Sequence, residues 1–128
     1  MALPKSIQSA ATQIQPFIRK TPFIHSKAFS ELTGADVWFK LESFQVTGSF
    51  KARGATNKLL SLTDEEKANG VVSASTGNHG AAVAYAAGKF GIDCTIYVPD
   101  DASSTKLENM KQRYNPDPPS FPLSSLLG

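Results

Sequence analysis

The chain has 128 residues, and its 13 Lys and Arg against 11 Asp and Glu leave a net charge of +2. A charge this small gives no support to binding of nucleic acid or of an anionic membrane surface. The single cysteine excludes an intramolecular disulfide and, with only two histidines, a Cys/His zinc cluster. No apolar run approaches the ~20 residues of a membrane span. With 41% hydrophobic residues, the composition is typical of one intracellular α/β domain or of a fragment of a larger protein.

The first thirty residues contain four basic side chains and no acidic one. Ile7, Ile14 and Ile18 recur at helical spacing, which predicts an amphipathic helix that Pro16 ends or kinks. An acid-poor, basic, amphipathic start is also typical of an organelle transit peptide. The localisation predicted is cytoplasmic, with a mitochondrial transit peptide as the alternative.

The residue pattern in the middle of the chain predicts a strand at 37–41, a loop at 42–48 and a helix at 50–62. Thr63 and Glu66 match the capping-box pattern, in which each residue satisfies the other's free backbone donor at the start of a short helix. Asn69 and Gly70 predict a left-handed end of that helix.

From residue 71 onward the pattern alternates between strand and helix: 71–75 strand, 81–90 helix, 92–98 strand and 103–113 helix. Connections this short indicate a βαβ unit with two parallel strands and a right-handed crossover. Because parallel strands are usually covered on both faces, we expect both strands to be buried. Residues 114–128 contain four prolines and no periodicity, so the fold is expected to be interrupted there.

Lys51, within the motif TGSFKARGA at 47–55, is the first candidate for chemistry. It lies in the first turn of its predicted helix, at the positive end of the helix dipole, where a cation is structurally misplaced. That position, together with burial, would lower the pKa of the amine, and a neutral lysine is what Schiff-base chemistry requires. Gly48 and Gly54 would let the backbone or another element approach closely. The alternative is a surface lysine that merely starts a helix.

The segment ASTGNHG at 74–80 connects a predicted strand to a predicted helix. Such connections open at the carboxyl ends of parallel strands, where ligands bind. Backbone donors at the helix start, with the side chains of Ser75, Thr76 and Asn78, suit a carboxylate or a phosphate. The alternative is a capping loop without a ligand, and His79 is interpreted as a capping histidine rather than a base.

Taken together and in this order, VWFKLES at 37–43, TGSFKARGA and ASTGNHG resemble the fold-type II pyridoxal-phosphate enzymes. Within them the similarity is to the threonine/serine ammonia-lyases (dehydratases) and the related serine racemases, and it runs from about Ile7 to Arg113. It implies an α/β, tryptophan-synthase-beta-like fold, truncated here, with an incomplete parallel three-layer sheet. It further implies three segments: 1–62 from the large cofactor domain, 63–113 as the front half of the small α/β domain, and 114–128 as a divergent Pro/Ser-rich tail.

The resemblance also implies a site for pyridoxal 5'-phosphate. Lys51 would bind the cofactor covalently and remove the substrate's α-proton, Phe50 would pack against the pyridine ring, and Asn78 would hydrogen-bond the ring's 3-oxygen. Racemases of the family have a serine hydroxyl at the position of Thr76 as a second acid/base, so Thr76 is a second catalytic candidate. No metal ligand is expected. The substrate carboxylate would be held by one loop: Ser75, Thr76, Gly77, Asn78 and His79.

The activity implied is the deamination of L-threonine or L-serine to a 2-oxo acid and ammonia. Serine racemase-like activity is the alternative. The expected partner is a small amino acid, with no nucleic acid and no membrane, and full-length relatives are expected to be homo-oligomers. Family members continue well beyond this region with a glycine-rich loop for the cofactor phosphate, so the chain alone is expected to be inactive or impaired. The tail is interpreted as non-family sequence, such as a frameshifted end, or as part of a non-catalytic protein that binds a partner subunit.

Overall fold

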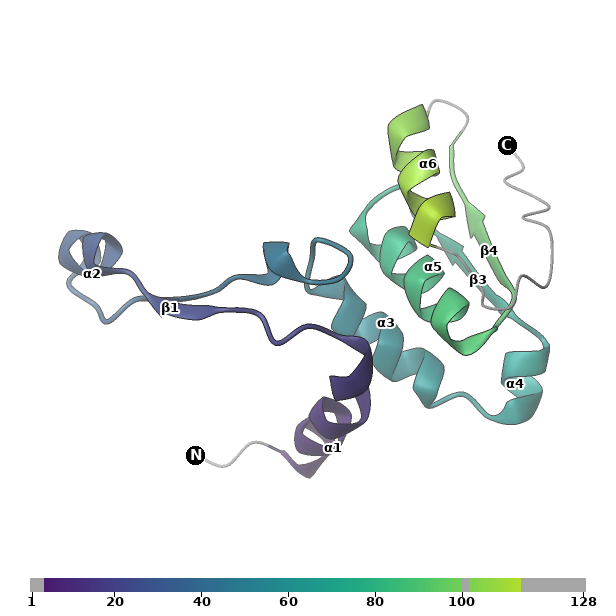
Figure 1. The fold of residues 1–128 in the computed structure, drawn as a ribbon, viewed down its shortest axis with the longest axis horizontal. Helices are drawn as coiled ribbons and strands as arrows, with labels where there is room; N and C mark the ends of the chain where they lie inside the picture. Colours follow the sequence, from purple (N-terminus) through teal and green to yellow (C-terminus); the bar gives the residue numbers. More distant parts are fainter. Residues whose placement is uncertain (1–3, 100–101, 114–128) are drawn as a thin grey trace.

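The computed structural model describes residues 4–99 and 102–113, so the predicted tail at 114–128 lies outside the described part. The described chain forms a body of helices packed on one face of a two-stranded sheet, and a long arm projects from that body (Figure 1). The arm is built from the first part of the chain and the sheet from the second. None of the helices in the described ranges is long and apolar enough to cross a membrane.

Helix α1 (Lys5–Ile14) is followed by a 3₁₀ turn at Gln15–Phe17, so the helix ends next to Pro16 as predicted. Its last residue, Ile14, is buried. The segment is tied to helix α5 (Asn78–Phe90) by two contacts. The Tyr85 hydroxyl donates to the Phe17 carbonyl over 2.6 Å, and the Phe17 ring meets the Phe90 ring edge-on at 4.9 Å.

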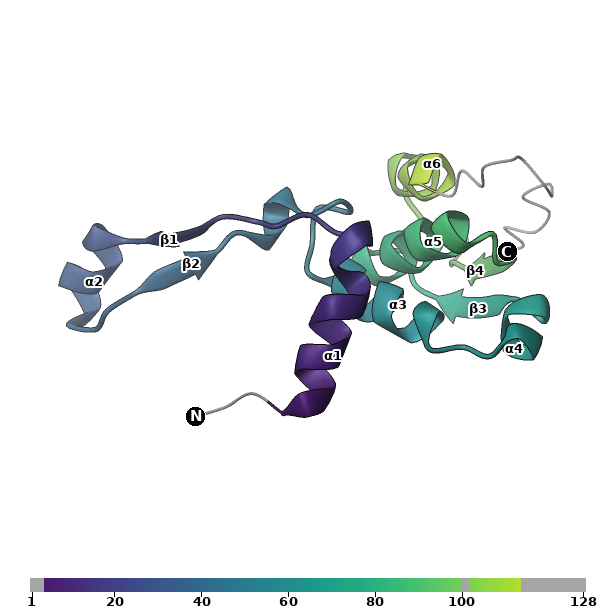
Figure 2. The ribbon, with the colours of Figure 1, turned by 60° about the horizontal axis from the view of Figure 1, so that its bottom comes forward.

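The arm is an antiparallel pair of short strands, β1 (Phe23–His25) and β2 (Trp38–Lys40), with helix α2 (Lys27–Thr33) at its tip (Figure 2). Every residue of both strands is exposed, and α2 buries none of its residues. Strand β2 confirms the strand predicted over 37–41. Strand β1 and helix α2 were not predicted, although Ser26 caps α2 and Gly34 ends it with a φ of 70°.

Helix α3 (Lys51–Leu60) confirms the helix predicted over 50–62, and the loop before it contains a 3₁₀ turn at Glu42–Phe44. Helix α4 (Asp64–Ala68) begins with the predicted capping box. The Glu66 N–H donates to the Thr63 hydroxyl over 3.2 Å, and the Thr63 N–H donates to the Glu66 carboxylate over 2.7 Å.

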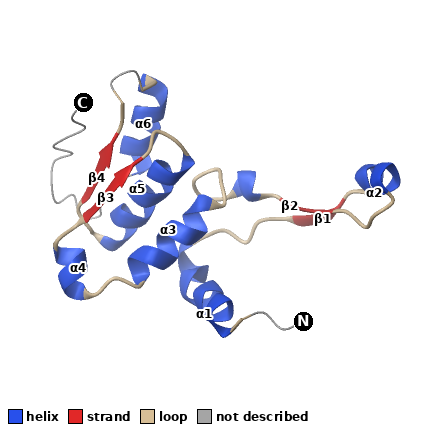
Figure 3. Cartoon of the chain, turned by 180° about the vertical axis from the view of Figure 1, so that it is seen from behind, coloured by secondary structure: helices blue, strands red, loops and turns tan. Residues whose placement is uncertain are grey.

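The predicted βαβ unit is present, with strands β3 (Val71–Ala74) and β4 (Cys94–Tyr97) parallel and α5 between them in the sequence. Helix α5 begins three residues earlier than predicted, at Asn78. It lies on one face of the sheet, flanked by α3 and by helix α6 (Ser104–Arg113) (Figure 3). The core is built where α3, α5 and the segment that leads into β4 meet. The residues buried there are Ala55, Leu59, Ala82, Val83, Ala86, Ala87 and Ile92.

The expectation that both parallel strands are buried is wrong for one face of the sheet. Val72 is 72% exposed and Tyr97 is 52% exposed, whereas Ile96 is buried under the helices. The described helices lie on a single face, so the alternating side chains that point the other way remain in solvent.

The backbone conformation and the close contact at Gly70 both require glycine, and the cost of replacing it can be measured. Its φ is +75°, and a Cβ added there would lie 3.0 Å from the Asp93 carbonyl oxygen, which already accepts the Val71 N–H over 2.7 Å. We expect Gly70→Ala to lower the free energy of unfolding by about 2 kcal/mol, from left-handed strain plus this contact. Gly91→Ala, at a φ of +63° with no described atom within 4 Å of its Cβ, should cost only about 1 kcal/mol. Urea unfolding followed by circular dichroism measures both, and equal losses would contradict the role of the Asp93 contact.

Candidate active site

Lys51 is the first residue of α3, and its side chain is exposed rather than buried as expected. Its amine lies over the ring of Phe50, with Nζ 4.9 Å from the ring centroid. The Lys51 N–H donates to the Ser49 hydroxyl over 3.4 Å, a long and weak hydrogen bond. Phe50 precedes the helix as its N-cap residue and makes no side-chain hydrogen bond to it. The amine is therefore accessible, with an exposed aromatic face beside it.

The loop before Lys51 is fixed by the buried side chain of Gln45. Its amide oxygen accepts the Arg19 N–H over 2.8 Å, and its amide nitrogen donates to the Arg19 carbonyl over 3.0 Å. Gly48 takes a φ of +73°, with no described atom within 4 Å of where its Cβ would lie. The expected close approach at Gly48 is therefore wrong, and glycine is required there by the backbone conformation.

The same loop is closed by an ion pair between Glu42 and Arg53. Arg53 Nε donates to Glu42 Oε2 over 2.8 Å, and Arg53 Nη2 donates to Glu42 Oε1 over 2.7 Å. The Thr21 hydroxyl donates to Oε1 as well, over 2.5 Å. The hydrogen bonds from Arg53, with those from Thr21 and Gln45, lower the pKa of Glu42 from 4.5 to about 2, although burial opposes the shift.

The second predicted segment follows β3. The Ser75 N–H donates to the Tyr97 carbonyl over 3.1 Å, which extends the strand pairing by one residue, and the Gly77 N–H donates to the Ser75 hydroxyl over 3.3 Å. Ser75 and Thr76 are half-buried, whereas Gly77, Asn78 and His79 are exposed. Asn78 and His79 belong to the first turn of α5, which starts early because Gly77 serves as its N-cap.

No described side chain caps the start of α5, so the interpretation of His79 as a capping histidine is wrong. The free N–H groups of a first helical turn and the positive end of the helix dipole favour an anion at this position. This part of the sequence prediction, an anion site at a strand-to-helix connection, is compatible with the observed backbone.

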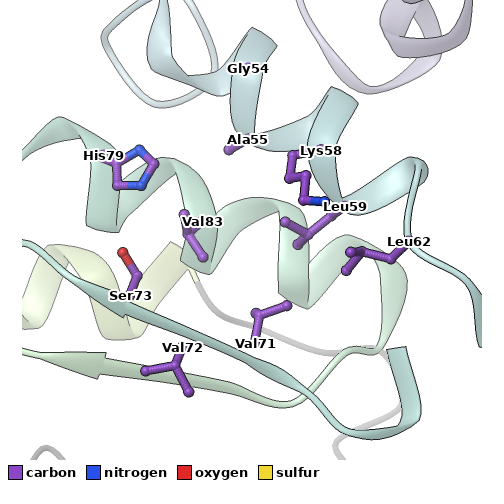
Figure 4. Close-up of a pocket in the computed structure, with 10 residues that line it drawn as sticks. All are labelled: Gly54, Ala55, Lys58, Leu59, Leu62, Val71, Val72, Ser73, His79 and Val83. Atoms are coloured by element: carbon purple, nitrogen blue, oxygen red, sulfur yellow. The ribbon is translucent and has the colours of Figure 1, made fainter. Parts of the chain in front are cut away.

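A cavity of about 280 Å³ lies between α3, α5 and β3 (Figure 4). Gly54 lines it from the first turn of α3 and His79 from the first turn of α5. Lys51, Gly54 and Lys58 are spaced at i, i+3 and i+7, which places them on one face of α3. Lys51 lies about one turn before Gly54, at the N-terminal end of that face. The structure thereby brings the first turns of α3 and α5 to one cavity, through Gly54 and His79. His79 is the one predicted site residue in the lining, which does not include the others: Phe50, Lys51, Ser75, Thr76, Gly77 and Asn78.

Two residues that line this cavity, Lys58 and Ser73, were not predicted from the sequence. Lys58 could have been found from its helical spacing to Lys51. Ser73 could have been found only by knowing which face of β3 the helices cover. No described atom lies within 4 Å of a Cβ placed on Gly54, so the expected close approach there is also wrong and the cavity stays open beside it.

These residues fit pyridoxal phosphate. An accessible lysine amine can react with an aldehyde, the uncapped start of α5 suits an anionic group, and the side of α3 next to Lys51 is left open by Gly54. Other chemistries have less support. Burial raises the pKa of the Cys94 thiol to about 11, and the described residues contain no cluster of three metal-ligating side chains.

The family profile described as pyridoxal-phosphate dependent enzyme matches residues 14–113. The L-threonine dehydratase catabolic TdcB of Staphylococcus aureus is 48% identical over 106 residues, which are 82% of this chain and 31% of that relative. The crystal structure of serine racemase from Dictyostelium discoideum has a TM-score of 0.82 at 42% identity, over 88% of this chain and 37% of that one. The structure of maize serine racemase has a TM-score of 0.80 at 41% identity, over 87% and 34% of the two chains.

This chain thus spans about a third of the length of the relatives that it matches. The matched region contains both motifs and every described strand of the body. The fold agrees as well, since a small α/β arrangement with two partial sheets superposes on part of much longer enzymes. Because the family match covers most of its length, the chain belongs to the family of pyridoxal-phosphate dependent enzymes.

Proposed function

We propose that this chain carries the cofactor lysine and the substrate loop of a threonine/serine ammonia-lyase, which deaminates L-threonine or L-serine to a 2-oxo acid and ammonia. The observation that carries the proposal is the cavity between α3 and α5. Its walls include the first turn of the helix that starts at Lys51 and the first turn of the helix that starts at Asn78. The amine of Lys51 lies at the start of one of these helices, and the anion site lies at the start of the other.

Each residue has a role that follows from its position. Lys51 holds the cofactor through its amine and moves the proton of the substrate α-carbon to and from Nζ. Phe50, whose exposed ring already lies under that amine, covers one side of the cofactor ring, and Asn78 donates to the ring oxygen. When bound, pyridoxal phosphate supplies an electron sink for the bond that breaks at the α-carbon.

The substrate carboxylate is assigned to the loop of five residues after β3. The N–H groups at the start of α5 and the Ser75 and Thr76 hydroxyls orient it, because an anion at a helix start is stabilised by the dipole and by unpaired donors. Holding the substrate carboxylate at this loop and the substrate amine at the cofactor orients the substrate α-carbon toward Lys51. In this proposal 1–62 contributes the lysine side of the site and 63–113 the loop side.

Racemisation of serine is a second candidate. Thr76 places a half-buried hydroxyl on the substrate loop, where it can hold or deliver a proton on the face of the substrate opposite Lys51. The similarity to the Dictyostelium serine racemase supports this candidate as strongly as the similarity to TdcB supports the lyase.

The lysine assignment is tested on the 128-residue chain itself. The chain is incubated with pyridoxal phosphate, reduced with borohydride and digested, and the modified lysines are mapped by mass spectrometry. We expect Lys51 to be labelled roughly tenfold more than Lys58, which lies on the same face of the same helix and serves as an internal reference. Lys51→Ala should remove the preferred label and leave that of Lys58 unchanged. Equal labelling of the two lysines would overturn the proposal.

The reaction is tested in a chimera in which residues 14–113 replace the matched region of TdcB. Formation of 2-oxobutyrate from threonine supports the lyase, and formation of D-serine that is lost in Thr76→Ala supports the racemase. Lys51→Ala should lower either activity at least about a thousandfold. Formation of neither product by a folded chimera that binds the cofactor would contradict both candidates.

A further inference from the structure

The ion pair between Glu42 and Arg53 is unlike the other ion pairs of the described residues. Its two hydrogen bonds are 2.7 and 2.8 Å long, and the side chains of Arg53 and Glu42 are only 33% and 16% exposed. The pair Lys27–Glu31 has a single contact of 3.7 Å between two exposed side chains. A bidentate, sheltered pair holds its partners in one geometry, whereas a single exposed pair contributes little.

The pair closes a loop that contains Lys51. Glu42 begins the 3₁₀ turn after β2, and Arg53 lies two residues after Lys51, in the first turn of α3. Arg53 is also held through its backbone, because its N–H donates to the Phe50 carbonyl over 3.1 Å. Fixing the Arg53 side chain therefore restricts how the whole first turn, including Lys51, can rotate or unwind.

The Glu42 end of the pair is itself immobilised. The buried Thr21 donates its hydroxyl to Glu42, and the Thr21 carbonyl accepts Lys40 Nζ over 2.7 Å. Residues next to β1 and within β2 thus hold the Glu42 carboxylate in place, Thr21 directly and Lys40 through Thr21. In the proposed function these segments contact neither the cofactor nor the substrate.

Helix α3 needs such an anchor. Helix ends fray, and a capping side chain normally prevents it. The N-cap residue of α3, Phe50, makes no such hydrogen bond, and the hydroxyl of Ser49 accepts the Lys51 N–H only over a long 3.4 Å. We propose that the Glu42–Arg53 pair compensates for this weak cap and is the interaction that holds Lys51 in position at the start of α3. This inference rests on the proposed role of Lys51, and it makes Glu42 and Arg53 positioning residues.

The test uses the labelling ratio of Lys51 to Lys58 in the 128-residue chain, together with hydrogen exchange of the first turn of α3. Glu42→Gln and Arg53→Lys should each lower the ratio roughly threefold to tenfold and speed exchange in that turn. The double variant should lower the ratio no further than the more damaging single variant does, because both changes disrupt the same bidentate ion pair. Thr21→Val, which leaves the pair in place and removes one hydrogen bond to it, should give a smaller decrease, and it provides the measurement if Glu42→Gln does not fold.

Two controls separate positioning from general stability. Glu31→Gln removes an exposed ion pair and should change nothing. Gly70→Ala destabilises the body far from Lys51 in the sequence, and it should leave the ratio unchanged. If Gly70→Ala lowers the ratio as much as Glu42→Gln does, or if Glu42→Gln and Arg53→Lys leave it unchanged, the positioning role is wrong. If the unaltered chain shows no preference for Lys51, the proposed function itself has failed.

Discussion

Replacing Ile92 with alanine is expected to lower the free energy of unfolding by about 2–5 kcal/mol. Ile92 is 2% exposed and lies in the core cluster between α3 and α5. Most of its buried neighbours are alanines, Ala86 and Ala87 among them, and an alanine has no rotamers with which to fill a void. The cavity left by the lost side-chain carbons should therefore stay open. Urea unfolding followed by circular dichroism gives the change in free energy.

Val72 provides the matched control for Ile92. It is a β-branched residue of similar size on the open face of the sheet, and it is 72% exposed. Val72→Ala should cost well under about 1 kcal/mol, since little apolar surface returns to water. Equal losses at Val72 and Ile92 would mean that the face described as open is covered in solution.

The elements of the body could be predicted from sequence because each has a local signal. The capping box at Thr63, the glycine at position 91 and the apolar periodicity of α5 depend only on neighbouring residues. Helix α2 has the same kind of caps but buries no residue, so it has no apolar stripe by which to be recognised. Helix α2 was missed for that reason.

The site could be predicted only in part. Lys51 and Asn78 could be proposed from sequence because each lies in a motif that is a continuous segment. The cavity between the two helices could not be predicted, since it depends on α3 packing against α5. The Glu42–Arg53 pair was not predicted either, because its two partners are 11 residues apart and the Thr21 hydroxyl that joins them is 21 residues from Glu42. The open face of β3 was mispredicted because burial of a strand depends on the layers present around it, and the strand's own sequence does not specify them.

Acid is expected to remove a specific part of the stability through Glu42. Its pKa falls from 4.5 to about 2 on folding, chiefly because Arg53 donates hydrogen bonds to the ionised carboxylate. The folded state therefore keeps this carboxylate ionised where the unfolded chain begins to take up a proton. With solvent screening of the partly exposed Arg53 taken into account, the pair contributes on the order of 2 kcal/mol. That contribution is fully present above about pH 5 and is lost as the pH falls from 4.5 toward 2.

The measurement is the free energy of unfolding of the unaltered chain minus that of Glu42→Gln, between about pH 7 and pH 2. The difference should be constant above about pH 5 and should shrink toward pH 2, because a protonated Glu42 resembles glutamine. Glu66, whose pKa is also lowered by its hydrogen bonds within the capping box, titrates in both proteins and cancels from the difference. A difference that does not depend on pH would show that Arg53 does not stabilise the charged form, and the anchor proposed for Lys51 would then lose its physical basis.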